Sequence, residues 1–193
     1  TETGTNKVEQ GGTLKSENDK DTIITNQNKD KASSNTVTIE ANGENDKVEV
    51  KLEDVNIDAS SRGEAAVSVT GKGDTNIELD GDNELKSGAD HAGLEHNKTD
   101  TSGELTIQDK DKNGSLDATG GLHGAGIGGG NAQNGQVTIT GGDITATAGS
   151  TAGIYQTLGG GAGIGGGDGG AGKGGNGDVE ITGGTITATG VYG

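Results

Sequence analysis

The residues best suited to chemistry lie between positions 109 and 117, where oxygen-bearing side chains alternate around a glycine. The run Asp109-Lys-Asp-Lys-Asn-Gly114 matches the D-x-[DN]-x-[DN]-G pattern. In that pattern alternating oxygens and a sharp glycine turn surround a hard cation. Five residues between positions 109 and 117 can offer oxygen ligands: Asp109, Asp111, Asn113, Ser115 (through its backbone carbonyl) and Asp117 (directly or through water). The sequence therefore predicts a calcium site, with calcium as the one expected cofactor.

The same run departs from a complete EF-hand loop. Its twelfth position is Gly120, where a bidentate glutamate would complete the calcium shell. No helices are expected on either side of it. The alternative interpretation is a solvated turn between two strands, because Asn113-Gly114 is a turn signal by itself.

Other chemical groupings are less specific. His91 and His96 lie near acidic residues, as a zinc site would require. Their five-residue spacing places them on opposite faces of a strand, so surface histidines are favoured here and at His123. The segments 124–129 and 161–166 fit the dinucleotide-binding pattern G-x-G-x-x-G, but more glycine and a strand follow each, where a helix is needed. A repeated corner is the better interpretation.

Catalysis is not expected. No Ser/His/Asp or Cys/His grouping stands out, and Arg62 is the only arginine. A polysaccharide lyase would need calcium and a cation or strong base, and residues 120–193 carry only five formal charges. The many acidic residues leave a hydrolytic carboxylate pair open as an alternative. We expect a binding protein, with Tyr155 and Tyr192 as the two rings on which a sugar could stack.

Composition excludes several classes of protein. The formal net charge is −16, without a basic cluster, which argues against binding to nucleic acid or to an anionic membrane surface. No apolar run is long enough for a membrane-spanning helix, so membrane insertion is not expected. Only 32 of the 193 residues are Val, Ile or Leu, and Phe, Met, Trp and Cys are absent. This aliphatic fraction is below the ~20% at which high charge usually indicates disorder.

Internal repetition argues against disorder. The segment Gly124-Ala-Gly-Ile-Gly-Gly-Gly130 recurs at 161–167. Two more segments recur in the same order: 135–141 as 177–183, and 142–147 as 184–189. A fixed order of short segments at a period of 20–50 residues is typical of a solenoid. Three segments per period indicate three strands per coil.

The repeats predict a right-handed parallel β-helix of about five to six coils over residues 35–193, glycine-rich from residue 120. Residues 1–34 are expected to form a polar cap over its open strand edges. Alternation assigns eight aliphatic residues to the interior: Val137, Ile139, Ile144, Ala146, Val179, Ile181, Ile186 and Ala188. Stacked at ~4.8 Å, such residues form ladders, so a small aliphatic count can fill a narrow core.

Stacking adds two carboxylates to the predicted calcium site. If Leu79 lies beside Ile107, then Asp80 and Asp82 occupy the same corner as residues 109–117, one coil away. Carboxylates at that separation repel one another unless a cation or solvent screens them. Calcium is therefore expected to order this corner.

Several segments carry a family resemblance. They are 54–58, 65–69, 76–79, 81–85 and 124–129, within a resemblance that covers roughly residues 36–190. The chain resembles the β-helical carbohydrate-binding surface proteins of clostridia and related Gram-positive bacteria. The resemblance implies a secreted or cell-surface protein that binds plant-type or acidic polysaccharide, with calcium in some members.

Two other classes of function stay open. A structural role, as an adhesin shaft or a self-associating surface module, suits the repetitive body equally well. The outward pairs Thr145/Thr147 and Thr187/Thr189 are similar to the threonine arrays of ice-binding solenoids, but two stacked pairs make a short array.

Overall fold

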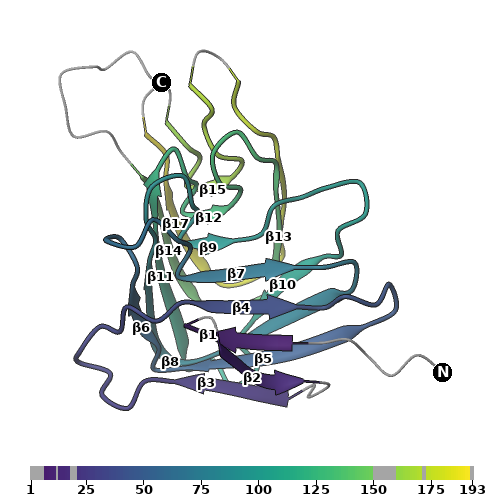
Figure 1. The fold of residues 1–193 in the computed structure, drawn as a ribbon, viewed down its shortest axis with the longest axis vertical. Helices are drawn as coiled ribbons and strands as arrows, with labels where there is room; N and C mark the ends of the chain where they lie inside the picture. Colours follow the sequence, from purple (N-terminus) through teal and green to yellow (C-terminus); the bar gives the residue numbers. More distant parts are fainter. Residues whose placement is uncertain (1–6, 12, 18–20, 150–159, 171–172, 192–193) are drawn as a thin grey trace.

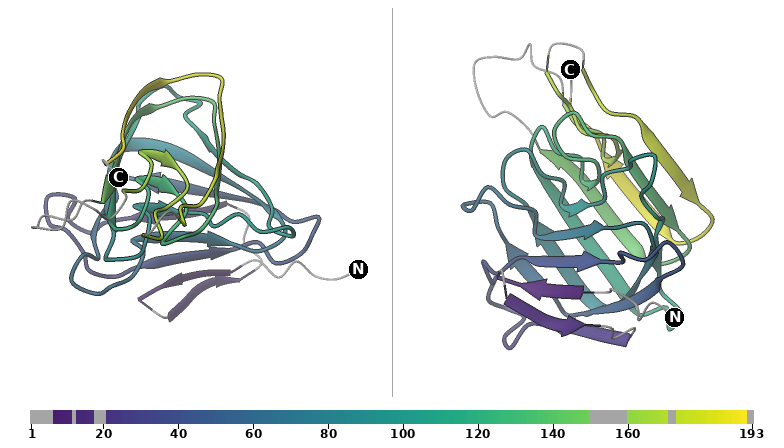
Figure 2. Two further views of the ribbon diagram at one scale, coloured as in Figure 1. Left: turned by 90° about the horizontal axis from the view of Figure 1, so that it is seen from above. Right: turned by 45° about the vertical axis from the view of Figure 1, so that its right-hand side comes forward.

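The computed structural model describes residues 7–11, 13–17, 21–149, 160–170 and 173–191, and within them the chain is all-β (Figure 1). Successive strands stack in coils along the long axis of the molecule, and the view from above shows the coils enclosing a narrow interior (Figure 2). Each coil contributes one strand to each of three sheets. The predicted parallel solenoid with three strands per coil is therefore confirmed.

Three parallel sheets form the walls of the solenoid. The first sheet contains β4 (Val37–Glu40), β7 (Val67–Thr70), β9 (Leu94–Glu95), β12 (Ile127–Gly128) and β15 (Ile164–Gly165). The second contains β5 (Lys47–Glu53), the first half of β8 (Asp74–Lys86), β10 (Leu105–Gln108), β13 (Gly135–Ile139) and β16 (Gly177–Ile181). The third contains β6 (Asn56–Asp58), the second half of β8, β11 (Gly114–Leu122), β14 (Asp143–Gly149) and β17 (Thr185–Thr189).

The described strands make about four turns, slightly fewer than the five to six predicted. The N-terminal end of the solenoid has a different pairing pattern. There β1 (Lys7–Gln10) and β2 (Thr13–Glu17) form an antiparallel pair, and β1 joins the first sheet antiparallel to β4. Only β3 (Asp21–Thr25) joins a sheet in the parallel sense, beside β5. These residues close the edge of the solenoid but do not complete a coil.

Alternation along the strands produces the predicted core. Val137, Ile139, Ile144 and Ala146 are each 0% exposed, as expected for inward positions. In the last coil the paired positions keep the same register, but Val179 is 38% and Ile181 48% exposed, and Ala188 is exposed as well. Ile186 is partly buried against the core. Within the described residues no strand stacks beyond β16 and β17, so burial there is incomplete.

Glycine before the first-sheet strands follows from the close approach of the coils. A Cβ at Gly126 would lie 2.5 Å from the carbonyl oxygen of Gly163 and 2.5 Å from the backbone nitrogen of Thr147. One coil earlier, a Cβ at Gly93 would lie 2.7 Å from the carbonyl oxygen of Gly126. Any side chain at these positions would push adjacent coils apart. The recurrent Ala-Gly-Ile and Ala-Gly-Leu segments are therefore a packing requirement.

Candidate functional site

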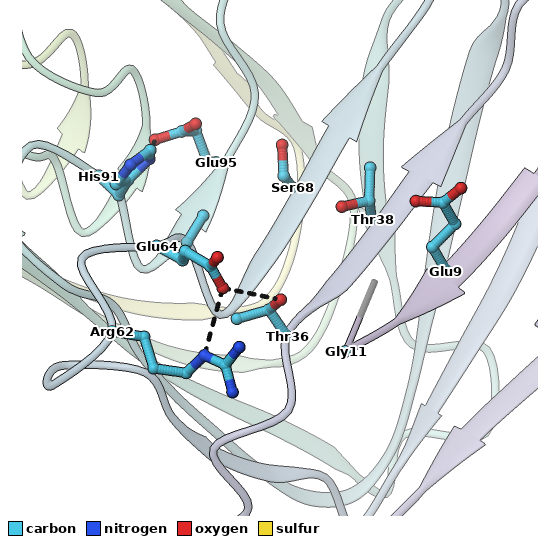
Figure 3. Close-up of a pocket in the computed structure, with 10 residues that line it drawn as sticks. Glu9, Gly11, Thr36, Thr38, Arg62, Glu64, Ser68, His91 and Glu95 are labelled. Atoms are coloured by element: carbon cyan, nitrogen blue, oxygen red, sulfur yellow. Dashed lines mark hydrogen bonds and ion pairs between the residues drawn. The ribbon is translucent and has the colours of Figure 1, made fainter. Parts of the chain in front are cut away.

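A shallow groove of about 340 Å³ lies on the outer face of the first sheet, next to the N-terminal hairpin (Figure 3). Its lining is mainly polar and includes Glu9, Thr36, Thr38, Arg62, Glu64, Ser68, His91 and Glu95. These residues come from four adjacent strands and from the turns that precede β4, β7 and β9. The groove thus gathers side chains from successive coils onto one surface.

Four of the lining residues form a row across the sheet. Glu9 pairs in register with Thr38, Thr38 with Ser68, and Ser68 with Glu95. Adjacent strands lie ~4.8 Å apart, so the row from Glu9 to Glu95 spans about 14 Å. All four occupy outward positions, because the residue before each of them is buried in the core: Val8, Val37, Val67 and Leu94. Figure 3 shows the four side chains side by side along the groove.

One end of the groove is held by an exposed ion pair. The Arg62 Nε atom lies 3.4 Å from Glu64 Oε2, and the Thr36 hydroxyl donates to the same oxygen at 3.3 Å. Both charged side chains are more than two-fifths exposed. The only guanidinium of the chain is therefore already matched by a carboxylate.

The Glu95 side chain is fixed by hydrogen bonds and is buried, unlike the exposed Arg62–Glu64 pair. Its Oε2 atom lies 2.9 Å from His91 Nδ1 and accepts the backbone N–H of Ala92 at 3.1 Å. The residue is only 6% exposed. A Cβ at Gly130 would lie 2.8 Å from the same oxygen, so a glycine there leaves room for the carboxylate. This fixed carboxylate defines one end of the row.

The other two histidines lie outside the groove. His96 is 2% exposed, so its expected surface position is wrong. Its Nδ1 donates to the Gln136 carbonyl oxygen at 2.8 Å, and burial lowers the pKa of its ring. His123, which is partly exposed, pairs with the buried carboxylate of Asp168 at 3.2 Å. Both histidines connect different coils and stabilise the stacking.

The 109–114 turn is organised by its own carboxylate. The two oxygens of Asp109 accept the backbone N–H groups of Asn113, at 3.2 Å, and Gly114, at 3.0 Å. The side-chain amide of Asn113 donates to Asp80 Oδ1 at 2.9 Å. This arrangement matches the alternative interpretation of a hydrogen-bonded turn between strands.

The predicted corner exists, in a different register. Ile107 pairs with Ile77, not Leu79, and Ser115 pairs with Asp82. The Ser115 hydroxyl donates to Asp82 Oδ1 at 2.9 Å. The shift of two residues arises because the 109–113 turn is longer than the corresponding turn of β8. Asp80 and Asp82 nevertheless lie one coil from the predicted loop.

In the structure, the side chains of the predicted calcium ligands do not point toward one common position. Asp111 and Asp117 are exposed, and Asp117 projects from the third sheet in register with Glu84. Asp109, Asp80 and Asp82 each accept hydrogen bonds from neighbouring residues. Across the described ranges no three acidic or histidine side chains are grouped so that they could hold a metal ion. The calcium site therefore remains a prediction.

The predicted sugar-stacking rings, Tyr155 and Tyr192, lie outside the described residues. The groove was not predicted from the sequence. Thr38, Ser68 and Glu95 occupy equivalent outward positions in successive first-sheet strands, and aligning those strands would have grouped them. Glu9 gave no such signal, because it reaches the row through an antiparallel strand.

No protein-family model, no curated protein and no solved structure matches the chain. Among the described residues no helix is long and apolar enough to cross a membrane.

Proposed function

We propose that this chain is a non-catalytic polysaccharide-binding module of a secreted or cell-surface protein, and that the first-sheet groove is its binding site. The observation that carries the proposal is the row Glu9, Thr38, Ser68 and Glu95, which aligns hydrogen-bonding side chains across four strands. The family resemblance of the sequence points to the same function.

The row suits the chemistry of a sugar chain. Hydroxyl groups donate and accept hydrogen bonds, and carboxylates accept them, so the row offers partners for the hydroxyls of successive sugar rings. The groove is open and shallow, as an extended polymer requires, and a rigid stack of coils holds its side chains at fixed spacing. Solenoids commonly present such extended surfaces to their ligands.

In this proposal, calcium is needed only for binding acidic glycans. The groove carries more carboxylates than cations, and the whole chain has a net charge of −16, so a uronate polymer would be repelled unless a cation bridged the two. Calcium dependence is therefore expected for acidic polysaccharides alone. Neutral plant-type polysaccharides should bind equally well after chelation.

Binding to insoluble and soluble polysaccharides tests the proposal. We expect Thr38→Val and Ser68→Ala, each of which removes a groove hydroxyl, to weaken binding about two- to ten-fold. Thr145→Val is the matched control, because Thr145 projects outward from the third sheet. Equal losses in all three variants, or no binding to any polysaccharide, would contradict the proposal. Binding to polygalacturonate, measured with and without calcium, tests whether acidic glycans bind through a calcium bridge.

Self-association is a second candidate function, favoured by the last coil. Val179 and Ile181 are exposed, whereas Val137 and Ile139 of the preceding strand are buried, and no strand among the described residues pairs with the outer edge of β16. Exposed edges of this kind pair readily with other strands. Light scattering of the protein alone tests this role: a concentration-dependent increase in mass supports it, and a constant monomer mass contradicts it.

A further inference from the structure

We infer that the groove selects glycans that carry free amines, such as polymers of glucosamine, over uronates and over their neutral N-acetylated counterparts. This inference rests on the proposed function, since it names the class of sugar bound at the same site. It is carried by the distribution of charge along the groove.

The charges of the groove do not cancel. Three carboxylates, Glu9, Glu64 and Glu95, face one guanidinium and one imidazole. Arg62 is paired with Glu64, and the His91 ring, which carries charge only when protonated, lies at hydrogen-bond distance from Glu95. Within the part of the chain that the structure describes, no side chain pairs with the Glu9 carboxylate, which leaves one unmatched negative charge at the end of the row.

The position of Glu9 places this charge where a bound sugar could present an amine. Glu9 is adjacent in register to Thr38, and Figure 3 shows its carboxylate in the same row as the Thr38 and Ser68 side chains, away from Arg62. A sugar whose hydroxyls contact Thr38 and Ser68 would therefore bring an amine of the same or the next ring to Glu9. An ammonium donates charge-assisted hydrogen bonds to a carboxylate, which are stronger than neutral ones.

The same geometry disfavours a uronate. A carboxylate on the sugar would meet Glu9 at one end and the hydrogen-bonded Glu95 at the other. The single guanidinium that could attract it is already paired with Glu64. An N-acetylated sugar is not repelled, but it has no charge to match Glu9.

Isothermal titration of the whole chain with a glucosamine tetramer and with its N-acetylated form tests the inference. The two probes share one backbone and differ in the acetyl groups and the charge. At about 0.15 M salt the general attraction of an anionic protein for a polycation is screened. We expect the free amine form to bind more tightly, and Glu9→Gln to weaken it about two- to five-fold while leaving the N-acetylated form unchanged. Glu44→Gln, an exposed carboxylate in the turn before β5, is the control of equal charge.

The outcomes separate the two proposals. Equal affinity of the two tetramers, or an equal loss in Glu9→Gln and Glu44→Gln, would overturn the amine selectivity and leave glycan binding intact. Binding of neither tetramer nor any other polysaccharide would overturn the proposed function itself. A lysine tetramer that binds as tightly as the glucosamine tetramer, with the same dependence on Glu9, would show a general cation site and would also overturn the inference.

Discussion

Ile139 and Ile181 occupy the same position in successive coils, paired in register between β13 and β16, yet their environments differ. Ile139 is 0% exposed and Ile181 is 48% exposed. Their local sequences are also similar, Val-Thr-Ile and Val-Glu-Ile. The difference comes from what lies on each side: within the described ranges, Ile139 is covered by coils in both directions and Ile181 in only one. Burial in this fold is a property of the stack, and the strand alone does not determine it.

The opposite end of the solenoid is covered. Val8, from the antiparallel hairpin, is 4% exposed, and Ile24, from β3, is 9% exposed, so both join the core. The hairpin also supplies Glu9 to the groove. The N-terminal end thus combines a cap with part of the candidate site, whereas the last described coil has free strand edges.

The largest expected effect on stability comes from truncating Ile139, the buried member of the Ile139/Ile181 pair. Ile139→Ala should lower the free energy of unfolding by about 2–5 kcal/mol, because a fully packed side chain is replaced by a cavity between coils. Ile181→Ala should cost about 1 kcal/mol or less, since half of that side chain already contacts solvent. Urea denaturation of both variants measures the difference. Equal losses would show that the last coil is covered in solution.

A smaller loss of stability is expected from adding a methyl group where two coils meet. Gly126→Ala should destabilise by about 1–3 kcal/mol, because the new Cβ would lie 2.5 Å from the Gly163 carbonyl oxygen and neither coil can move freely. Gly174→Ala is the control, since its Cβ would have no neighbour closer than 3.7 Å. Thermal unfolding compares the two. A melting temperature for Gly126→Ala equal to that of the control would disprove the close approach of the coils.

The smallest effect is expected from His96, the buried histidine that connects β9 to β13. Burial lowers its pKa below the usual value of about 6.5, so the unfolded chain binds a proton more readily than the folded one. The stability contributed by the neutral ring is complete above about pH 6.5 and is lost as the pH falls below it. Denaturation between pH 8 and pH 5.5 measures this slope. His96→Gln should reduce the slope, and an unchanged slope would assign it to other groups.

Sequence patterns predicted the solenoid because its core follows a local rule. Alternation identified Val137 and Ile144 as inward, and the repeats identified the three strands of each coil. The same patterns could not give burial in the last coil, because exposure there depends on what stacks against it. They also misaligned Leu79 with Ile107, because the length of a corner turn is not fixed by the strands that flank it.

The candidate site was harder to predict than the fold. The Asp109 motif predicts a cation site because its oxygens are close in sequence, but in the structure Asp109 accepts hydrogen bonds from backbone N–H groups of its own turn. The groove residues are about 30 residues apart, and Glu9 joins them through an antiparallel strand. Only the register of four strands brings them together, and no local motif encodes that register.

Mapping a bound oligosaccharide onto the backbone tests the central claim most directly. In a titration of isotopically labelled protein with the glucosamine tetramer, followed by amide chemical shifts, we expect the largest changes at Glu9, Thr38, Ser68 and Glu95, with little change in the third sheet. The largest changes at Thr145, Thr147, Thr187 and Thr189, or no changes with this or any other oligosaccharide at saturation, would contradict the assignment of the first-sheet groove as the binding site.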